Sequence, residues 1–265
     1  MRFMSIASGS SGNSYYVGTD KVSLLLDAGI SMKRIDSGLG NLGLSLRDID
    51  GVLITHEHID HVKSLGSMAR KYNIPIYATY GTIDGIMTVG SLGTFDYNLF
   101  KPLKNDCSFV LGDMNINVHP ISHDASDPVC YSFENEGHKL SIATDMGKYD
   151  ESLMDFLSES EAMLIEANHD IRMLEVGPYP YPLKQRILGD KGHLCNEAAG
   201  KLIRELLHDK IKYIGLGHLS DKNNYPSLAY ETVKQALADN VYTDDVRDFG
   251  LTVASRSECG EIIEL

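Results

Sequence analysis

The sequence predicts an α/β protein in which helices lie outside two facing β-sheets. Two strand-rich stretches are each followed by helical patterns, which is typical of such a sandwich. The chain of 265 residues, 43% hydrophobic and 23% charged, is long enough to bury a sizeable core and has an ordinary globular composition. The sequence contains no repeat, low-complexity block or long linker. We therefore expect one domain spanning residues 1–265.

The first half of the chain is expected to form short strands separated by tight turns. Short apolar runs predict these strands: Met1–Ala7, Ser14–Val17, Val22–Asp27, Val52–Thr55 and Ile76–Ala78. Helical spacing of apolar residues predicts a helix at Ile59–Tyr72 and another at Thr82–Met87.

The second half repeats this order, with more strands before its helices. Helical patterns cover Asn196–Asp209 and Ser227–Ala238. The expected strands are Cys107–Leu111, Met114–His119, Val129–Glu134, Leu140–Thr144, Ala162–Glu166, Tyr213–Leu216, Leu251–Ala254 and Glu261–Leu265.

The charge balance limits the classes of partner. The net charge is −13, from 24 Lys and Arg against 37 Asp and Glu. A nonspecific polyanion binder is usually basic, so this balance argues against that class. An enzyme that grips phosphates locally is still compatible with it, because bound cations reverse the local field of a site.

The sequence predicts a cytoplasmic location. No apolar run approaches twenty residues, so no membrane span is expected. The start, Met1–Ile6, lacks the long apolar region of a secretory signal and resembles a first strand. Four widely separated cysteines form no CxxC pair, and we expect reduced thiols at Cys107, Cys130, Cys195 and Cys259.

Residues Thr55–His61 are the most informative segment of the chain. They place three imidazoles and a carboxylate directly after an apolar strand. In an extended chain His56 and His58 leave the strand on the same side. Asp60 and His61 then fall in the turn that opens the next helix, where they can face a second ion. Imidazoles and carboxylates are ligands of zinc and its neighbours, so the segment predicts a site for two metals.

Further ligand candidates share one position in the pattern. His123, Asp145 and His218 each follow an apolar, strand-like run. A ligand at the end of a strand is held by a rigid element and stays open to substrate. Taken singly, His123 and Asp145 are also compatible with ordinary polar loop residues.

Together these features resemble the metallo-β-lactamase superfamily. The resemblance covers most of the chain and implies a four-layer αββα sandwich with a dinuclear site between the sheets. It implies that one ion is held by His56, His58 and His123, the other by Asp60, His61 and His218, and that Asp145 bridges both. His119 is the alternative third-segment ligand, but it lies inside the strand run and before Pro120.

A more specific resemblance is to the YycJ/WalJ group of metal-dependent hydrolases. That group implies a nuclease with 5′→3′ exonuclease action on double-stranded DNA and a proposed link to mismatch repair. The matching segments are Ala7–Ser14, Ser122–Ala125, Glu166–Asp170, Gly192–Leu194 and Gly217–Ser220. The first of them is compatible either with a tight turn or with a phosphate cradle.

Glu166 and His193 are the candidate acid pair. The segments around them resemble the tRNA 3′-processing nucleases, in which a glutamate-oriented histidine protonates the leaving oxygen. A departing alkoxide needs a proton or a metal contact, and a nearby carboxylate favours the protonated imidazolium. Asp60 is the further catalytic candidate, as a carboxylate that accepts a proton from the nucleophile. An ordinary helix-cap histidine and a surface carboxylate are the alternatives for His193 and Glu166.

Other residues are expected to contact substrate. Cys195 stands where the family and its relatives usually have a small hydroxyl residue, which puts a phosphate contact from that side chain in doubt. The segment Gly177–Arg186 carries two tyrosines spaced by prolines, then Lys184 and Arg186. It predicts either a wall that stacks a base and holds a phosphate or a rigid surface loop. The residues expected to line the substrate groove are Asn168, His169 and Ser220.

The predicted metal site and acid pair favour a dinuclear phosphodiester hydrolase, and the resemblance implies that it acts on DNA as a 5′→3′ exonuclease. The alternative on the same fold is a small-molecule hydrolase, either a cyclic phosphodiesterase or a glyoxalase-II-like thioester or lactone hydrolase. A non-catalytic metal-binding regulatory protein is the alternative of another class. Zinc suits the imidazoles and manganese tolerates the carboxylates, so two Zn²⁺ or Mn²⁺ ions are expected.

Overall fold

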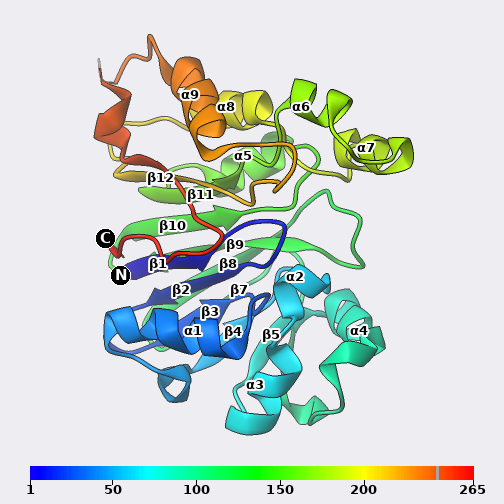
Figure 1. Cartoon of the computed structure of the whole chain (residues 1–265). Helices are drawn as coiled ribbons and strands as arrows, with labels where there is room; N and C mark the ends of the chain where they lie inside the picture. The colour runs from blue at the N-terminus through cyan, green and yellow to red at the C-terminus, as the bar shows by residue number, and fades with distance from the viewer. Residues whose placement is uncertain (243–244) are drawn as a thin grey trace. The chain divides into compact units, whose positions relative to one another are not determined.

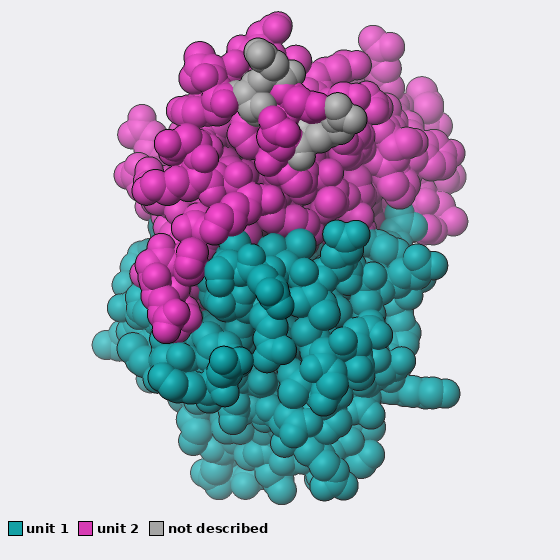
Figure 2. Space-filling view, turned by 90° about the vertical axis from the view of Figure 1, so that its left-hand side faces the viewer, with its two compact units in different colours: residues 1–120, 125–129, 255–265 teal, residues 121–124, 130–254 magenta. Residues whose placement is uncertain are grey.

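Residues 1–242 and 245–265 are described by the computed structural model (Figure 1), and the chain divides into two units (Figure 2). Unit 1 comprises Met1–Pro120, Ala125–Val129 and Ser255–Leu265. Unit 2 comprises Ile121–Asp124 and Cys130–Ala254. Figure 2 colours unit 1 teal and unit 2 magenta.

Unit 1 contains a mixed sheet in the order β14-β1-β2-β3-β4-β5-β6. The strands β1, β2 and β3 pair antiparallel, whereas β3 to β6 run parallel. The carboxyl ends of the parallel strands therefore meet at one edge of the sheet. The strands are β1 Arg2–Ala7, β2 Ser14–Gly18, β3 Ser23–Leu26, β4 Gly51–Leu53, β5 Ile76–Thr79, β6 Phe100–Leu103 and β14 Ile263–Glu264, with the antiparallel hairpin β7 Ser108–Leu111 and β8 Met114–Pro120 completing the strands of the unit.

Helices lie on one face of the unit 1 sheet (Figure 1). Their apolar side chains, such as Ile35 and Met68, pack in one buried cluster with strand residues such as Leu25 and Val52. Burying a side chain of this size contributes about 1.5–3 kcal/mol. The helical segments are α1 Met32–Leu39, α2 Ile59–Val62, α3 Leu65–Tyr72 and α4 Tyr80–Thr88, with short 3-10 turns η1 Gly40–Leu42, η2 Leu46–Asp48, η3 Gly90–Leu92 and η4 Tyr97–Leu99.

Unit 2 is built on strands in the order β13-β12-β11-β10-β9. The first two in sequence, β9 and β10, form an antiparallel hairpin, and β10 to β13 run parallel. Parallel strands again bring their carboxyl ends to one edge, where β10, β11 and β12 lead into candidate site residues. The strands are β9 Val129–Asn135, β10 His138–Ala143, β11 Ala162–Glu166, β12 Tyr213–Gly217 and β13 Leu251–Val253.

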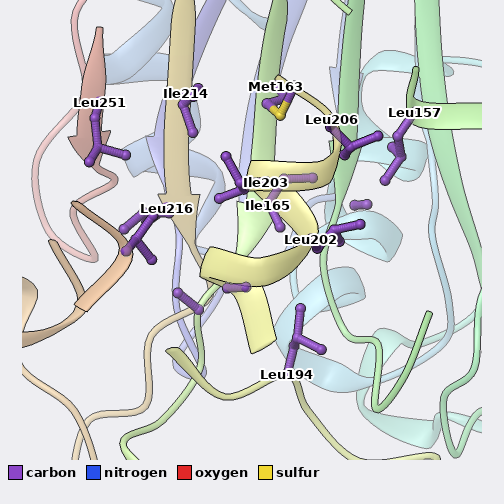
Figure 3. Packing of buried hydrophobic residues seen from close by; sticks show 14 of the residues in the cluster. Leu157, Met163, Ile165, Leu194, Leu202, Ile203, Leu206, Ile214, Leu216 and Leu251 are labelled. Carbon is purple, nitrogen blue, oxygen red and sulfur yellow. The ribbon is translucent and has the colours of Figure 1, made fainter. Parts of the chain in front are cut away.

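The helices of unit 2 bury a second core. In Figure 3, Leu202 and Ile203 of α8 lie over Ile165 of β11 and Leu216 of β12, in the same buried cluster. Leu194 is also in this cluster and is 3% exposed, so the segment that carries His193 is anchored in the core. The helical segments are α5 Glu151–Leu157, α6 Ile171–Val176, α7 Tyr181–Leu188, α8 Asn196–Glu205, α9 Pro226–Leu237 and the 3-10 turn η5 Val246–Phe249.

Some sequence expectations differ from these elements. The expected helix Ile59–Tyr72 is two helices, since α2 ends at Val62 and α3 begins at Leu65. The segment Gly177–Arg186, interpreted as either a substrate wall or a rigid surface loop, enters α7 at Tyr181. Its third proline, Pro182, lies in the first turn of that helix, where a missing N–H costs nothing.

No helix within residues 1–242 and 245–265 combines the length and the apolar character needed to cross a membrane.

Candidate metal centre

Unit 1 gathers three imidazoles immediately after β4. The ring centroid of His56 lies 4.6 Å from that of His58 and 4.1 Å from that of His61. His56 and His61 are fully buried, whereas His58 and Asp60 are half-buried. His58 precedes the first turn of α2, so the chain direction changes between the first two histidines and the third. The segment predicted from sequence as a ligand cluster therefore brings its histidines together.

Asp27 holds one of these imidazoles by its Nδ1 atom. Its Oδ2 lies 2.7 Å from His61 Nδ1, and its Oδ1 accepts a hydrogen bond of 2.9 Å from the backbone N–H of Thr55. Burial raises the pKa of Asp27, and the charge and hydrogen bonds of His61 and Thr55 oppose that rise. With Nδ1 engaged, Nε2 of His61 is the atom available to a metal. Sequence reasoning missed Asp27, although its place at the end of a strand was the usable signal.

The Ser-Gly-rich turn near the N-terminus supports the same segment. The backbone N–H of Asn13 donates to the carbonyl of Asp60 at 2.8 Å, and Gly29 donates to the carbonyl of Asn13 at 2.8 Å. A Cβ atom at Gly29 would lie 1.6 Å from the carbonyl oxygen of Asp60, so only glycine fits there. The side-chain Nδ2 of Asn13 lies 3.1 Å from Nε2 of His61. This turn therefore fixes the position of the residues that follow His58.

Unit 2 places three further candidates at strand ends. Asp145 follows β10 with φ 61°, and His218 follows β12 with φ 53°. Such left-handed conformations are uncommon for residues other than glycine and cluster at functional sites. Asp145 Oδ1 lies 3.4 Å from Nε2 of His218 and 3.8 Å from Nε2 of His123. All three side chains are buried, so the structure brings the unit 2 candidates together.

The carboxylate of Glu166 contacts two histidines and two backbone N–H groups of this cluster. Its Oε1 accepts from Nδ1 of His193 at 2.8 Å and lies 2.9 Å from Nδ1 of His218, while its Oε2 accepts from the backbone N–H groups of Met146 and Leu194. Burial by itself raises the pKa of Glu166, but the charges and hydrogen bonds of the two histidines outweigh it and hold the pKa at about 2. A carboxylate with its acceptor positions used in this way orients histidines better than it binds an ion. The sequence predicted its contact with His193 and missed the one with His218.

The loop before α8 positions two histidines at once. The carbonyl of Gly192 lies 3.2 Å from Nδ1 of His123, and the backbone N–H of His193 donates to the carbonyl of Ile187 at 3.0 Å. The ring centroid of His193 lies 5.2 Å from that of His123 and 5.2 Å from that of His218. His193 keeps a partly exposed side chain among buried neighbours, as a group that reaches substrate must.

The donor chemistry fits divalent metal ions. Among the candidate ligands, His61 has Nδ1 beside Asp27, His218 has it beside Glu166, and His123 has it beside a backbone carbonyl. Metal-binding histidines characteristically donate their other ring N–H in this way, which leaves Nε2 for the ion. Within unit 2, the candidate donor atoms of Asp145, Glu166, His193 and His218 all lie within 4.8 Å of one another.

The three residues expected to line a substrate groove have different surroundings. Asn168 donates from Nδ2 to the backbone carbonyl of His218 at 2.8 Å, so it braces the ligand segment. The hydroxyl of buried Ser220 accepts from the backbone N–H of Asn223 at 3.3 Å. His169 is 1% exposed, and neither ring nitrogen has a hydrogen-bond partner among the described protein groups. Burial lowers the pKa of His169 to about 4, so its imidazole is neutral at pH 7.

Cys195 precedes the first turn of α8 without a side-chain hydrogen bond to cap that helix. Burial raises the pKa of its thiol, which therefore stays protonated at pH 7. His138 bonds to Glu161, and His208 bonds to the carbonyl of Ser160.

Comparison with known proteins identifies close relatives. The family model described as "Beta-lactamase superfamily domain" matches residues 23–214. Exodeoxyribonuclease YycJ of Bacillus anthracis is 40% identical over 238 residues, which cover 89% of each chain. Exodeoxyribonuclease WalJ of Streptococcus pneumoniae serotype 2 is 39% identical over 237 residues, covering 89% of this chain and 88% of that protein.

A solved structure agrees with the predicted fold class. The metallo-β-lactamase fold protein YhfI from Bacillus subtilis superposes with a TM-score of 0.71 at 15% identity, covering 98% of both chains. This likeness confirms the α/β sandwich expected from the sequence.

Proposed function

This chain belongs to the metallo-β-lactamase superfamily, and we propose that it is a metal-dependent 5′→3′ exonuclease of double-stranded DNA. The observation that carries the proposal is the 2.8 Å hydrogen bond between Glu166 and His193. It supplies an oriented proton donor, which an alkoxide leaving group needs and a thiolate scarcely does. Identity of 40% to exodeoxyribonuclease YycJ along 89% of the chain supports DNA as the substrate.

We propose that the chain works as one domain and holds two ions, Zn²⁺ or Mn²⁺. When bound, such a pair activates water as a nucleophile and neutralises charge on phosphate oxygens. The proposed ligands are His56, His58, Asp60, His61, His123, Asp145 and His218.

The protein's own side chains handle the protons in this proposal. Asp60 accepts the proton of the attacking water at its carboxylate. His193 donates a proton from Nε2 to the departing 3′ oxygen, while Glu166 holds Nδ1 and thereby orients the ring.

A small-molecule hydrolase is the second candidate, because a net charge of −13 suits it better than it suits a DNA enzyme. We place the protein in the cytoplasm, since no disulfide joins Cys107, Cys130, Cys195 and Cys259.

Turnover of three substrates by metal-reconstituted protein tests the proposal. Double-stranded DNA, bis-p-nitrophenyl phosphate and a thioester are compared in wild type and in His193→Ala. We expect DNA to have the highest kcat/KM and the variant to lose activity on it. Thioester turnover that exceeds DNA turnover and is unchanged in the variant would favour the small-molecule hydrolase.

A further inference from the structure

A pocket of about 300 Å³ lies between α6 and α7 in unit 2. Its lining combines a carboxylate, an aromatic ring, an ammonium group, an amide and an aliphatic side chain, from Glu175, Tyr181, Lys184, Gln185 and Leu188. Pockets that bind small ligands begin at about this size and likewise mix apolar walls with a few polar groups. The pocket is therefore large enough, and chemically varied enough, to hold one ligand group.

One face of α7 supplies most of this pocket. Tyr181, Lys184, Gln185 and Leu188 have the spacing that places side chains on one side of a helix. Such a face with large apolar groups normally packs inward, yet Tyr181 is 73% and Leu188 43% exposed. The buried contact of the helix is made by Ile187 instead. Two large apolar side chains thus stand open to solvent beside polar groups.

A backbone hydrogen bond joins α7 to His193, the candidate proton donor. The carbonyl of Ile187 accepts the backbone N–H of His193 at 3.0 Å, and a Cβ atom at Gly192 would lie 2.1 Å from that carbonyl oxygen. Arg186 forms a bidentate ion pair with Asp124, in which Nη2 of Arg186 lies 3.0 Å from Oδ1 of Asp124. Because α7 and His193 are tied at these points, the pocket keeps a fixed place next to the proton donor within unit 2.

The charge of this segment differs from that of the chain. Residues 171–192 contain four Lys and Arg residues and two acidic residues, within a chain of net charge −13. Lys184 donates from Nζ to the backbone carbonyl of Glu175 at 2.7 Å, and an ammonium group can donate two further hydrogen bonds. The segment therefore offers a local cation at the rim of the pocket, where a phosphodiester can approach.

We propose that this pocket binds one unpaired nucleobase of the DNA substrate. The base stacks on Tyr181, its edge bonds to the Gln185 amide and the Glu175 carboxylate, and Lys184 contacts the adjoining phosphate. Aromatic stacking accepts any base, which suits an enzyme that removes nucleotides regardless of sequence. The inference rests on the proposed exonuclease function and assigns it a subsite for the strand end.

The test compares DNA with a substrate too small to need the pocket. Tyr181→Ala is predicted to lower the ratio of kcat/KM for DNA to kcat/KM for bis-p-nitrophenyl phosphate by about 5- to 150-fold, the loss expected for one stacked base. Tyr181→Phe keeps the aromatic face and should keep the ratio near that of wild type. Tyr97→Ala is the matched control, since it removes a tyrosine of unit 1 that is 55% exposed.

A binding measurement gives an independent readout. A DNA duplex with 2-aminopurine in a short unpaired 5′ end is titrated with His58→Ala protein, and stacking on Tyr181 should quench its fluorescence. Quenching that persists in His58→Ala/Tyr181→Ala overturns the inference, as does an unchanged substrate ratio in Tyr181→Ala. A wild-type protein that hydrolyses bis-p-nitrophenyl phosphate but not DNA contradicts the exonuclease proposal itself, which separates the two failures.

Discussion

A glutamine at position 166 cannot accept all the hydrogen bonds that the carboxylate of Glu166 accepts. One carboxylate oxygen faces the Nδ1 atoms of His193 and His218, and the other accepts two backbone N–H groups. The NH₂ group of a glutamine would have to face one of these pairs and meet donors with donors. Because the site is buried, water cannot relieve this mismatch, and Glu166→Gln should lower the free energy of unfolding.

The pKa of Glu166 sets the size and the pH window of this loss. The pKa falls from its ordinary value of 4.5 to about 2 in the folded protein. Since each pKa unit corresponds to about 1.4 kcal/mol, the ionised carboxylate contributes about 3 kcal/mol to stability at pH 7. A lowered folded pKa means that this contribution is present above pH 4.5 and is lost as the pH falls toward 2.

Urea unfolding of chelator-treated wild type and Glu166→Gln at pH 7, 4 and 3 measures this contribution. The gap in unfolding free energy should be about 3 kcal/mol at pH 7 and about 1 kcal/mol at pH 3. A gap that stays constant over this range, or one below about 1 kcal/mol at pH 7, would refute the reasoning.

Glu161→Gln is the matched control for that experiment. Glu161 also pairs with a histidine, His138 at 2.9 Å, and with Lys212 at 2.7 Å, but it lies outside the metal cluster. Its replacement should cost stability without changing metal content or DNA turnover.

Three other substitutions probe separate parts of the site. Asp27→Asn should weaken metal binding by about 10- to 100-fold because His61 loses its carboxylate partner. Competition with a chromogenic chelator measures the metal affinity, and an affinity equal to that of wild type would contradict this role of Asp27. His193→Ala should cut DNA turnover by about 10²- to 10⁴-fold with metal content intact by elemental analysis, and metal loss in this variant would contradict its role as proton donor. Gly29→Ala should lower the free energy of unfolding by about 1–3 kcal/mol or more, because its Cβ would clash with the Asp60 carbonyl. Thermal unfolding measures this loss, with Gly40→Ala as the control because a Cβ atom there would meet no atom within 4 Å.

The sequence was most informative where ligands are close along the chain. His56, His58 and His61 were predicted together because one strand and one turn fix their geometry, and their rings do lie together in unit 1. Asp27 was missed because its contact with His61 depends on β3 running parallel to β4 in register, with Leu26 opposite Leu53. That register comes from tertiary pairing and leaves no local pattern.

The α6–α7 segment shows a second limit of sequence reasoning. Prolines at 178, 180 and 182 were compatible with a substrate wall or a rigid surface loop, but proline also fits the first turn of a helix, and α7 begins at Tyr181. The helix of only six residues at Ile171–Val176 has too few turns for a periodic pattern. Glu166 was predicted to orient His193, whereas its bond to His218 follows from β11 and β12 lying side by side.

Digestion of double-stranded DNA labelled at the 5′ or the 3′ end tests the central claim most directly, with metal-reconstituted wild type beside His58→Ala. A metal-dependent 5′→3′ exonuclease should release the 5′ label early and shorten 3′-labelled strands progressively. The His58→Ala variant should do neither. Early release of the 3′ label would contradict the polarity. Intact DNA together with rapid thioester hydrolysis would contradict the nuclease assignment.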